Sequence, residues 1–394
     1  MQQNKNTGIG MALLAMAIGG FAIGTGEFVI MGLLPDVAHG LGHSVTSTGN
    51  AITSYALGVV FGAPLIAVLG AQASRQRLLI FLMGLFAVGN IASALAPEYI
   101  SFVLSRFVSG LPHGAYFGIA SLVAASMVPA EQRGKAIGRM MTGLTVATLL
   151  GVPLAAWMGH HLNWHYAFLF VGICALVSLL MVIRYVPHLP GDKTAHPLHE
   201  LTALKTPQVL LVLLTGAAGF GGMFAVFSYI TPTLIHVAGM PGWAIPWVMA
   251  AFGLGMIVGM STGGRLSDWS VRKGITVALV WNLVVMVLFP LMATHAVTGV
   301  IATFLIGTTS MLIPCLQIRL MDVAGKAQTL AAAMNHSALN IANALGAFFG
   351  GMVIDAGYGW TSTAGVGGAL GIIGLLAYLC SLSRKKAKQS SCVS

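Results

Sequence analysis

Twelve long apolar runs, separated by short polar connections, make up almost the whole chain. A helix needs about 20 apolar residues to cross the hydrocarbon of a bilayer, and each run is long enough for one crossing. The runs begin near residues 8, 47, 78, 99, 136, 165, 208, 244, 274, 297, 329 and 362. The pattern predicts an all-α integral membrane protein with twelve transmembrane helices. The first run lacks a small-residue cleavage site, so we expect it to remain as a span.

The longest polar connection, HLPGDKTAHPLHELTALKT, lies between Pro187 and Pro207 and divides the spans into six plus six. It predicts a domain boundary. We expect an N-terminal six-helix bundle over residues 1–187, a cytoplasmic linker over 188–207, a C-terminal six-helix bundle over 208–383 and a basic cytoplasmic tail over 384–394.

The two halves repeat sequence landmarks at one fixed offset of 197 residues, for example 232 minus 35. The matching pairs are Pro35 and Pro232, Gly58 and Gly255, Gly62 and Gly259, Arg75 and Arg272, and Gly110 and Gly307. One shared offset predicts a parallel repeat, and therefore two pseudo-symmetric bundles.

Composition and charge fit this interpretation. Of 394 residues, 57% are apolar and 7% are charged, and the net charge is +10. The basic residues lie at or beside alternate connections, which places both termini in the cytoplasm under the positive-inside rule. The positive charge therefore reports membrane topology, and we expect the lipid bilayer as a partner rather than nucleic acid. We also expect a monomer in a bacterial inner membrane.

One acidic residue, Glu27, lies inside an apolar run, and one basic residue, Arg106, lies well within another. Both are about seven residues from the outer ends of their spans, which at about 1.5 Å per residue is roughly 10 Å deep. A charge in hydrocarbon is costly, so an intramembrane acid indicates a functional site, although a fixed ion pair or a protonated carboxyl would also explain it. Equal depth makes a Glu27–Arg106 pair possible.

Other polar and aromatic side chains form candidate walls of a substrate cavity. On the fourth span, Arg106, Gly110, His113 and Phe117 follow helical spacing and share one face. A histidine on such a face can equally be a structural residue. On the eleventh span, interhelical hydrogen bonding is an equal alternative for a polar stripe. That stripe comprises His336, Asn340 and Asn343, and the seventh span adds Phe224, Phe227, Ser228 and Tyr229.

Small residues recur every four positions on three spans, which lets helix backbones approach closely in lipid. These rows either pack neighbouring helices or, if they meet across the two halves, form contacts over which one half rocks against the other. The rows are Gly143, Ala147, Gly151, Ala155 and Gly159 on the fifth span; Ala251, Gly255, Gly259 and Gly263 on the eighth; and Ala338, Ala342, Gly346 and Gly350 on the eleventh.

Enzyme and metal chemistry find little support in the sequence. We find no combination of nucleophile, base and orienting group and no phosphate-binding loop, so an enzyme is not expected. Seven histidines lie at outer helix ends, but only the adjacent His160 and His161 have ligand spacing, which favours a polar rim over a metal site. No metal and no cofactor are expected.

The loop between the eighth and ninth spans resembles the cytoplasmic loop motif of the major facilitator superfamily. It reads Gly264-Arg265-Leu266-Ser267-Asp268, followed by Arg272 and Lys273. The resemblance implies that Asp268 caps a neighbouring helix and latches an inner gate, which agrees with the preference of carboxylates for helix N-termini. In the first-half copy, Ala71 and Ser74 replace the expected Asp and Gly, and Arg75 and Arg77 remain.

Further motifs resemble the twelve-span drug:proton antiporters, including the bacterial arabinose and sugar efflux permeases and the chloramphenicol exporters. Arg106, Gly110 and Gly114 resemble a motif that supplies a buried arginine in proton-coupled members. Gly143 to Gly159 resembles the antiporter motif, although Val152 separates Gly151 from Pro153 and Ala155-Ala156 replaces two glycines. The string TGEFVIMGLLPDVA in the first span looks most similar to these antiporters.

The resemblance implies a secondary active transporter that exports a small molecule, such as arabinose or chloramphenicol, in exchange for protons. Glu27 would accept the proton and Arg106 would hold Glu27 ionised until then. The departures in the fifth span leave proton-coupled uptake open. A non-transporting membrane sensor and a passive pore are alternatives of a different class.

Overall fold

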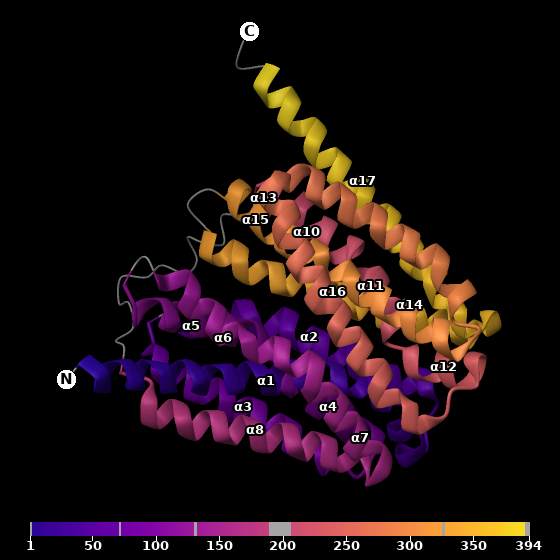
Figure 1. Ribbon diagram of the computed structural model, residues 1–394, viewed down its shortest axis with the longest axis horizontal. Helices are drawn as coiled ribbons and strands as arrows, with labels where there is room; N and C mark the ends of the chain where they lie inside the picture. The colour runs from indigo at the N-terminus through magenta and orange to yellow at the C-terminus, as the bar shows by residue number, and fades with distance from the viewer. Residues whose placement is uncertain (1, 71, 130–131, 189–205, 325–327, 391–394) are drawn as a thin grey trace. The chain divides into compact units, whose positions relative to one another are not determined.

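The computed structural model describes residues 2–70, 72–129, 132–188, 206–324 and 328–390, which are almost entirely helical (Figure 1). Eleven helical segments of these described residues are long and apolar enough to cross a membrane. One of them, Gly242–Met292, contains two predicted spans, divided at Ser270 by an extended residue with φ −172° and ψ 113°. The prediction of an all-α protein with twelve spans is therefore confirmed.

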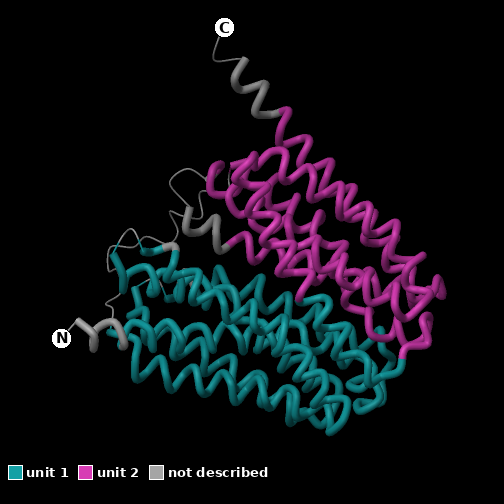
Figure 2. Tube along the Cα trace, in the orientation of Figure 1, with its two compact units in different colours: residues 1–197, 241–253 teal, residues 198–240, 254–394 magenta. Residues whose placement is uncertain are grey.

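The chain forms two compact units, coloured teal and magenta in Figure 2. The first unit comprises residues 1–197 and 241–253, and α1 packs along α6, α7 and α8 inside it. Its helices are α1 (Gln2–Leu41), α2 (Val45–Gly70), α3 (Arg75–Ala94), α4 (Tyr99–Gly110), α5 (His113–Ser126), α6 (Arg133–Val146), the π-helical η2 (Ala147–Gly151), α7 (Val152–His161), α8 (Trp164–Tyr185) and the short η4 (Gly242–Ala244).

The second unit comprises residues 198–240 and 254–394, and α10 packs against α15, α16 and α17 inside it. Its elements are α10 (Pro207–Gly219), α11 (Gly221–Phe227), α12 (Ile230–Ala238), most of α13 (Ile245–Met292), α14 (Ala296–Thr308), η5 (Thr309–Met311), α15 (Leu312–Ala324), α16 (Gln328–Val353), η6 (Ile354–Tyr358), η7 (Trp360–Ser362) and α17 (Thr363–Ser390).

Helix-breaking residues explain where the spans are interrupted. Pro112 has no backbone N–H, and the fourth span divides there into α4 and α5. In the fifth span, the π-helical η2 ends directly before Val152-Pro153. Ser270 ends the first part of α13, and its Oγ accepts from Lys273 N at 3.4 Å, as an N-cap does for a new helix. The fourth span is thus not the single continuous helix that the spacing of Arg106 and His113 predicted.

The same backbone contact occurs in both units at the predicted offset. In the first unit, Gly58 on α2 lies against the Phe107 carbonyl oxygen on α4, and a side chain at Gly58 would collide with it. In the second unit, Gly255 on α13 lies in the same way against the Phe304 carbonyl oxygen on α14. Because the two contacts match residue for residue, the repeat predicted from the sequence extends to the packing of the helices.

The predicted domain limits remain predictions. Of the proposed linker, residues 189–205 lie outside the described residues, as do residues 391–394 of the proposed tail. Residues 241–253, which come from the second half of the sequence, cluster with the first unit.

Candidate functional site

Glu27 and Arg106 lie in the interior of the first unit. Glu27 on α1 is 7% exposed and Arg106 on α4 is fully buried. The Nη2 of Arg106 donates a hydrogen bond of 2.8 Å to the carbonyl oxygen of Gly26, the residue that precedes Glu27. The structure records no ion pair between the Glu27 and Arg106 side chains, both of which are described residues.

Aromatic rings enclose the Arg106 guanidinium. Its central carbon lies 4.4 Å from the centre of the Tyr55 ring and 5.3 Å from that of Phe168. The faces of such rings attract a cation, and the attraction is larger when water is excluded. Within the described part of the chain, Nε and Nη1 of Arg106 have no hydrogen-bond partner. A buried donor without a partner is costly, so these two atoms are available to a carboxylate, a water molecule or a substrate oxygen.

A second polar contact joins Tyr55 to His113. The Tyr55 hydroxyl lies 3.0 Å from Nδ1 of His113, and both side chains are buried. Phe117 packs against His113, with ring centres 5.5 Å apart. The structure therefore brings together the predicted residues Glu27, Arg106, His113 and Phe117.

Sequence reasoning missed three residues of this site: Tyr55, Phe168 and Asn90. Tyr55 and Phe168 are aromatic residues inside apolar runs, where a core position gives the same pattern. Asn90 is fully buried, and its Oδ1 has no partner among the described residues. Its polar side chain inside the third span is a signal that could have identified it.

The candidate cavity residues of the second unit form a separate polar group. On α16, the Nδ2 of Asn340 donates to the His336 carbonyl oxygen at 3.1 Å. Oδ1 of Asn340 and both amide atoms of Asn343 have no partner within the described residues, although the two side chains are only 3% and 1% exposed. They are thus able to bind a polar ligand.

The aromatic candidates of the second unit have different surroundings. Tyr229 donates to the Ala347 carbonyl oxygen on α16 at 2.7 Å, a bond that ties neighbouring helices together. Phe224 and Phe227 are buried in α11, where Phe224 packs edge-on against Phe220. Ser228 is buried, and its Oγ lacks a partner among the described residues.

The predicted gate residues lie on helix ends. Asp268 is exposed and forms no ion pair with a described residue. The Arg272 carbonyl oxygen accepts from the Tyr378 hydroxyl at 2.9 Å, and Nζ of Lys273 lies 4.6 Å from the centre of the Trp269 ring. Arg75 is half-buried and Arg77 is exposed. The role of Asp268 as a latch remains a prediction.

The glycines in the rows of small residues pack against helices of their own units. Gly143, Gly151 and Gly159 of the fifth span lie against Ala17, Thr25 and Leu33 of α1, so both rows advance in steps of eight residues. In the second unit, Gly255 and Gly259 lie against residues 304–310, and Gly346 and Gly350 lie against residues 221–229. These positions follow the first of the two interpretations, the packing of neighbouring helices.

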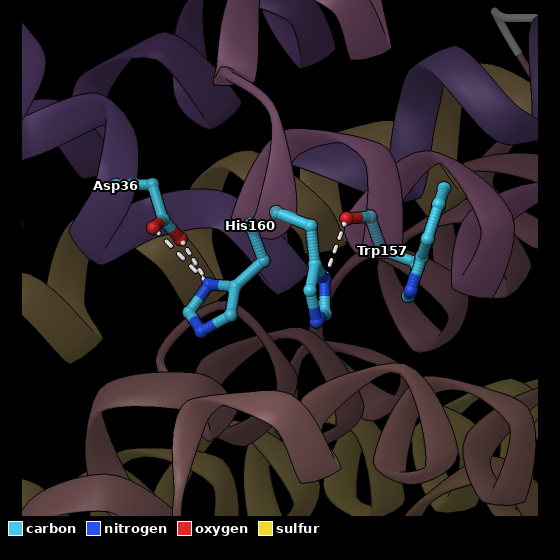
Figure 3. Close-up of polar contacts among 4 residues, drawn as sticks. Asp36, Trp157 and His160 are labelled. Atoms are coloured by element: carbon cyan, nitrogen blue, oxygen red, sulfur yellow. Dashed lines mark hydrogen bonds and ion pairs between the residues drawn. The ribbon is translucent and has the colours of Figure 1, made fainter.

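The ends of α1 and α7 are joined by a polar contact (Figure 3). Nδ1 of His160 lies 3.1 Å from Oδ1 and 3.2 Å from Oδ2 of Asp36. Asp36 also lines a surface pocket of about 330 Å³ with Pro35, His39, Gly40, Gly159, Asn163 and Trp164. Within the described residues, no three His, Cys, Asp or Glu side chains are arranged to hold a metal ion.

We expect Asp36→Asn to change stability only slightly. The Asp36 and His160 side chains are both 25% exposed. Ion pairs near the surface contribute about 0–1 kcal/mol to the free energy of unfolding because water screens them. Thermal unfolding of the purified protein, compared with His160→Gln, measures the effect. If Asp36→Asn lowered the free energy of unfolding by much more than about 1 kcal/mol, the contact with His160 would be a major stabilising interaction rather than a weak surface pair.

Comparison with known proteins places this site in context. The family profile described as Major Facilitator Superfamily matches residues 16–269 and 242–392. The chain is 39% identical to the inner membrane transport protein YdhP of Escherichia coli K12 over 388 residues, which cover 98% of this chain and 99% of that protein. The chain belongs to the major facilitator superfamily. It is therefore a multi-pass membrane protein and a secondary transporter, not an enzyme.

Two further relatives carry more specific names. A chloramphenicol resistance protein of Streptomyces lividans is 33% identical, with coverage of 85% of this chain and 86% of the relative. A probable sugar efflux transporter of Helicobacter acinonychis is 31% identical, with 93% of each chain covered. Among solved structures, a D-xylose–proton symporter matches with a TM-score of 0.75 at 19% identity over 95% of this chain and 97% of that one, which supports the fold.

Proposed function

We propose that this protein exports a small molecule across a bacterial inner membrane in exchange for protons that move inward, by alternating access of its two helical bundles. The observation that carries the proposal is the burial of Glu27 beside the guanidinium of Arg106. An ionisable acid within a span is costly to bury, and such residues mark substrate or ion pathways and proton relays in transporters. The names of two relatives, which mention sugar efflux and chloramphenicol resistance, support export.

Arg106 supplies the coupling in this proposal. Its charge favours the ionised form of a nearby carboxyl group, so Glu27 would bind a proton when the outer side supplies one. A neutral Glu27 no longer competes for Arg106, whose Nε and Nη1, without a partner among the described residues, would then bind other oxygen atoms. Proton and substrate would thus affect each other's affinity, which is the linkage that an antiporter requires.

The substrate we propose is a neutral molecule with several hydroxyl groups, either a sugar such as arabinose or an amphenicol such as chloramphenicol. The partnerless amide atoms of Asn340 and Asn343 support this choice, since an amide can both donate to and accept from a hydroxyl group. The other proposed substrate contacts are His113 and Phe117 in the first unit and Phe224, Phe227 and His336 in the second. We also propose that both termini are cytoplasmic, on the distribution of basic residues.

Proton movement in inside-out membrane vesicles tests the proposal. The vesicles are energised so that their interior is acidic, and arabinose, other sugars and chloramphenicol are added one at a time. An exporter should collapse the pH gradient with at least one of them, and vesicles that lack the protein should not respond. Accumulation with protons in right-side-out vesicles would show an importer instead. Movement that stops at equal concentrations would show a pore, and no movement of any compound would favour a sensor.

Replacement of Asp268 tests the proposed inner gate. If its carboxylate caps a neighbouring helix during the transport cycle, Asp268→Asn should remove about 1 kcal/mol from the latched state. A loss of that size changes a two-state equilibrium about fivefold, so exchange should slow while binding of the transported compound persists. Asp322→Asn, at another exposed carboxylate, is the control. If Asp268→Asn and Asp322→Asn exchanged protons for substrate at the same rate, the proposed role of Asp268 as a latch would be contradicted.

A further inference from the structure

Tyr55 on α2 contacts two of the candidate site residues at once. Its ring face lies 4.4 Å from the guanidinium carbon of Arg106, and its hydroxyl lies 3.0 Å from Nδ1 of His113. Tyr55, Arg106 and His113 are 1%, 0% and 3% exposed. All three belong to the first unit, and they come from α2, α4 and the start of α5. One buried side chain therefore connects the guanidinium beside Glu27 to an imidazole.

We propose that Tyr55 is a positioning residue that makes the protonation of His113 depend on the Glu27 and Arg106 site. The inference rests on the proposed proton coupling and extends it to a second titratable group. Tyr55 would hold Arg106 through its ring and His113 through its hydroxyl. A change of charge at the Glu27 and Arg106 site would then alter the proton affinity of His113, and protonation of His113 would alter the interaction of Tyr55 with Arg106.

The chemistry of the hydrogen bond supports this link. A neutral imidazole with a lone pair on Nδ1 accepts the hydroxyl proton of Tyr55. A protonated imidazole carries hydrogen on both nitrogens, so Nδ1 must donate and the Tyr55 oxygen must accept. When Nδ1 carries the lone pair, proton uptake by His113 therefore reverses the bond and turns the Tyr55 hydroxyl hydrogen away from the imidazole. The reversal changes the polarisation of a ring that lies against a buried cation.

Charged and titratable groups of the described residues lie on the helices around Tyr55 and His113. Glu27 faces it from α1 and Arg106 from α4, and Tyr116 follows on α5, where its hydroxyl donates to the Met16 carbonyl oxygen at 2.7 Å. Basic residues on the other helices packed against α5 are confined to the first two turns of α3 and α6. They are Arg75, Arg77, Arg133, Lys135 and Arg139.

Nitrogen NMR of ¹⁵N-histidine-labelled protein in lipid bilayers tests the proposal without any transported compound. The signal of His113 is assigned by its loss in His113→Gln and is followed through a pH titration. Tyr55→Phe keeps the ring against Arg106 and removes the hydroxyl from His113. Hydrogen bonds to charged groups are the stronger ones. Removal of the Tyr55 hydroxyl therefore destabilises the charged imidazole more than the neutral one. We expect the titration midpoint of His113 to fall by about 0.5 to 1 pH unit, a three- to tenfold weaker proton affinity.

Matched controls separate this effect from general disturbance. Tyr116→Phe removes another buried hydroxyl from the same unit, one that bonds a backbone carbonyl, and it should leave the His113 midpoint unchanged. The His165 signal should not move in either variant, because Nδ1 of His165 lies 2.6 Å from the Ala94 carbonyl oxygen. If Tyr55→Phe does not fold, 3-fluorotyrosine in the wild-type sequence weakens the hydroxyl as an acceptor and should also lower the midpoint.

An unchanged His113 midpoint in Tyr55→Phe, or with 3-fluorotyrosine where that variant does not fold, would overturn the role of Tyr55. This outcome is distinct from failure of the proposed function, because the titration requires no transport. If the midpoint falls as expected in a protein that does not exchange protons for substrate, the link between the residues holds and the exchanger proposal alone is wrong.

Discussion

Glu27→Gln should abolish uphill transport while the protein still folds. A proton gradient of one pH unit corresponds to about 1.4 kcal/mol, which can drive about tenfold accumulation of a neutral compound when one proton is exchanged. Glutamine has nearly the same shape as glutamic acid but cannot exchange a proton in this pH range. We therefore expect accumulation in inside-out vesicles to fall from up to about tenfold to about onefold, since the compound can then only equilibrate.

The matched control for this variant is Glu98→Gln, the same chemical change at an exposed carboxyl group that precedes α4. It should accumulate the compound as the wild type does. Glu27 is 7% exposed and lies beside Arg106, so the difference between the two variants isolates burial and the neighbouring charge. Full accumulation by Glu27→Gln would refute the assignment of Glu27 as the proton acceptor and would direct attention to His113.

The sequence made Glu27 and Arg106 predictable because a charge in an apolar run is rare and expensive. The twelve spans were predictable for a related reason, since hydrocarbon requires long apolar segments whose backbone polar groups are satisfied within helices. Most predicted starts lie within about three residues of the observed helices, within the usual uncertainty of helix boundaries. The eighth and ninth spans share the single label α13, but the non-helical Ser270 separates them.

The contacts within the site were harder to predict than its charged residues. The sequence made a Glu27–Arg106 pair possible, yet among the described residues Arg106 donates to the Gly26 carbonyl oxygen, because backbone as well as carboxylate oxygens accept from a guanidinium. Tyr55 was missed because a tyrosine within an apolar run resembles a core residue until its neighbours are known. The fourth span was treated as one helix, although Pro112 interrupts it between Arg106 and His113.

The repeat at an offset of 197 residues was visible in the sequence, but its physical meaning required the structure. Gly58 and Gly255 stood out only as matching glycines. In the structure each lies against the carbonyl oxygen of a neighbouring helix, Phe107 or Phe304, so the repeat marks two places where helix backbones touch. Close backbone approach replaces the hydrophobic driving force that helices lack in lipid, which explains why glycine occupies both positions.

Gly58→Val should therefore destabilise the first unit and disable the site together. Its added carbon atoms would overlap the Phe107 carbonyl oxygen, and Gly110 Cα would lie only 3.1 Å from the new Cβ. Backbone atoms cannot rotate away as side chains can, so α2 and α4 must separate. Overpacking of this kind costs about 1–3 kcal/mol. Tyr55 and Arg106 each lie within one turn of the contact, on the two helices that would separate.

Two further valine variants locate this effect. Gly118→Val places the same side chain on α5, where nothing lies within 4 Å, and it should unfold like the wild type. Gly255→Val creates the equivalent collision in the second unit, so it should lower the unfolding temperature about as much as Gly58→Val. It should nevertheless leave the His113 titration unchanged, because Tyr55, Arg106 and His113 belong to the first unit. A Gly58→Val protein as stable as Gly118→Val, with an unaltered titration, would show that α2 and α4 are not held together by this contact.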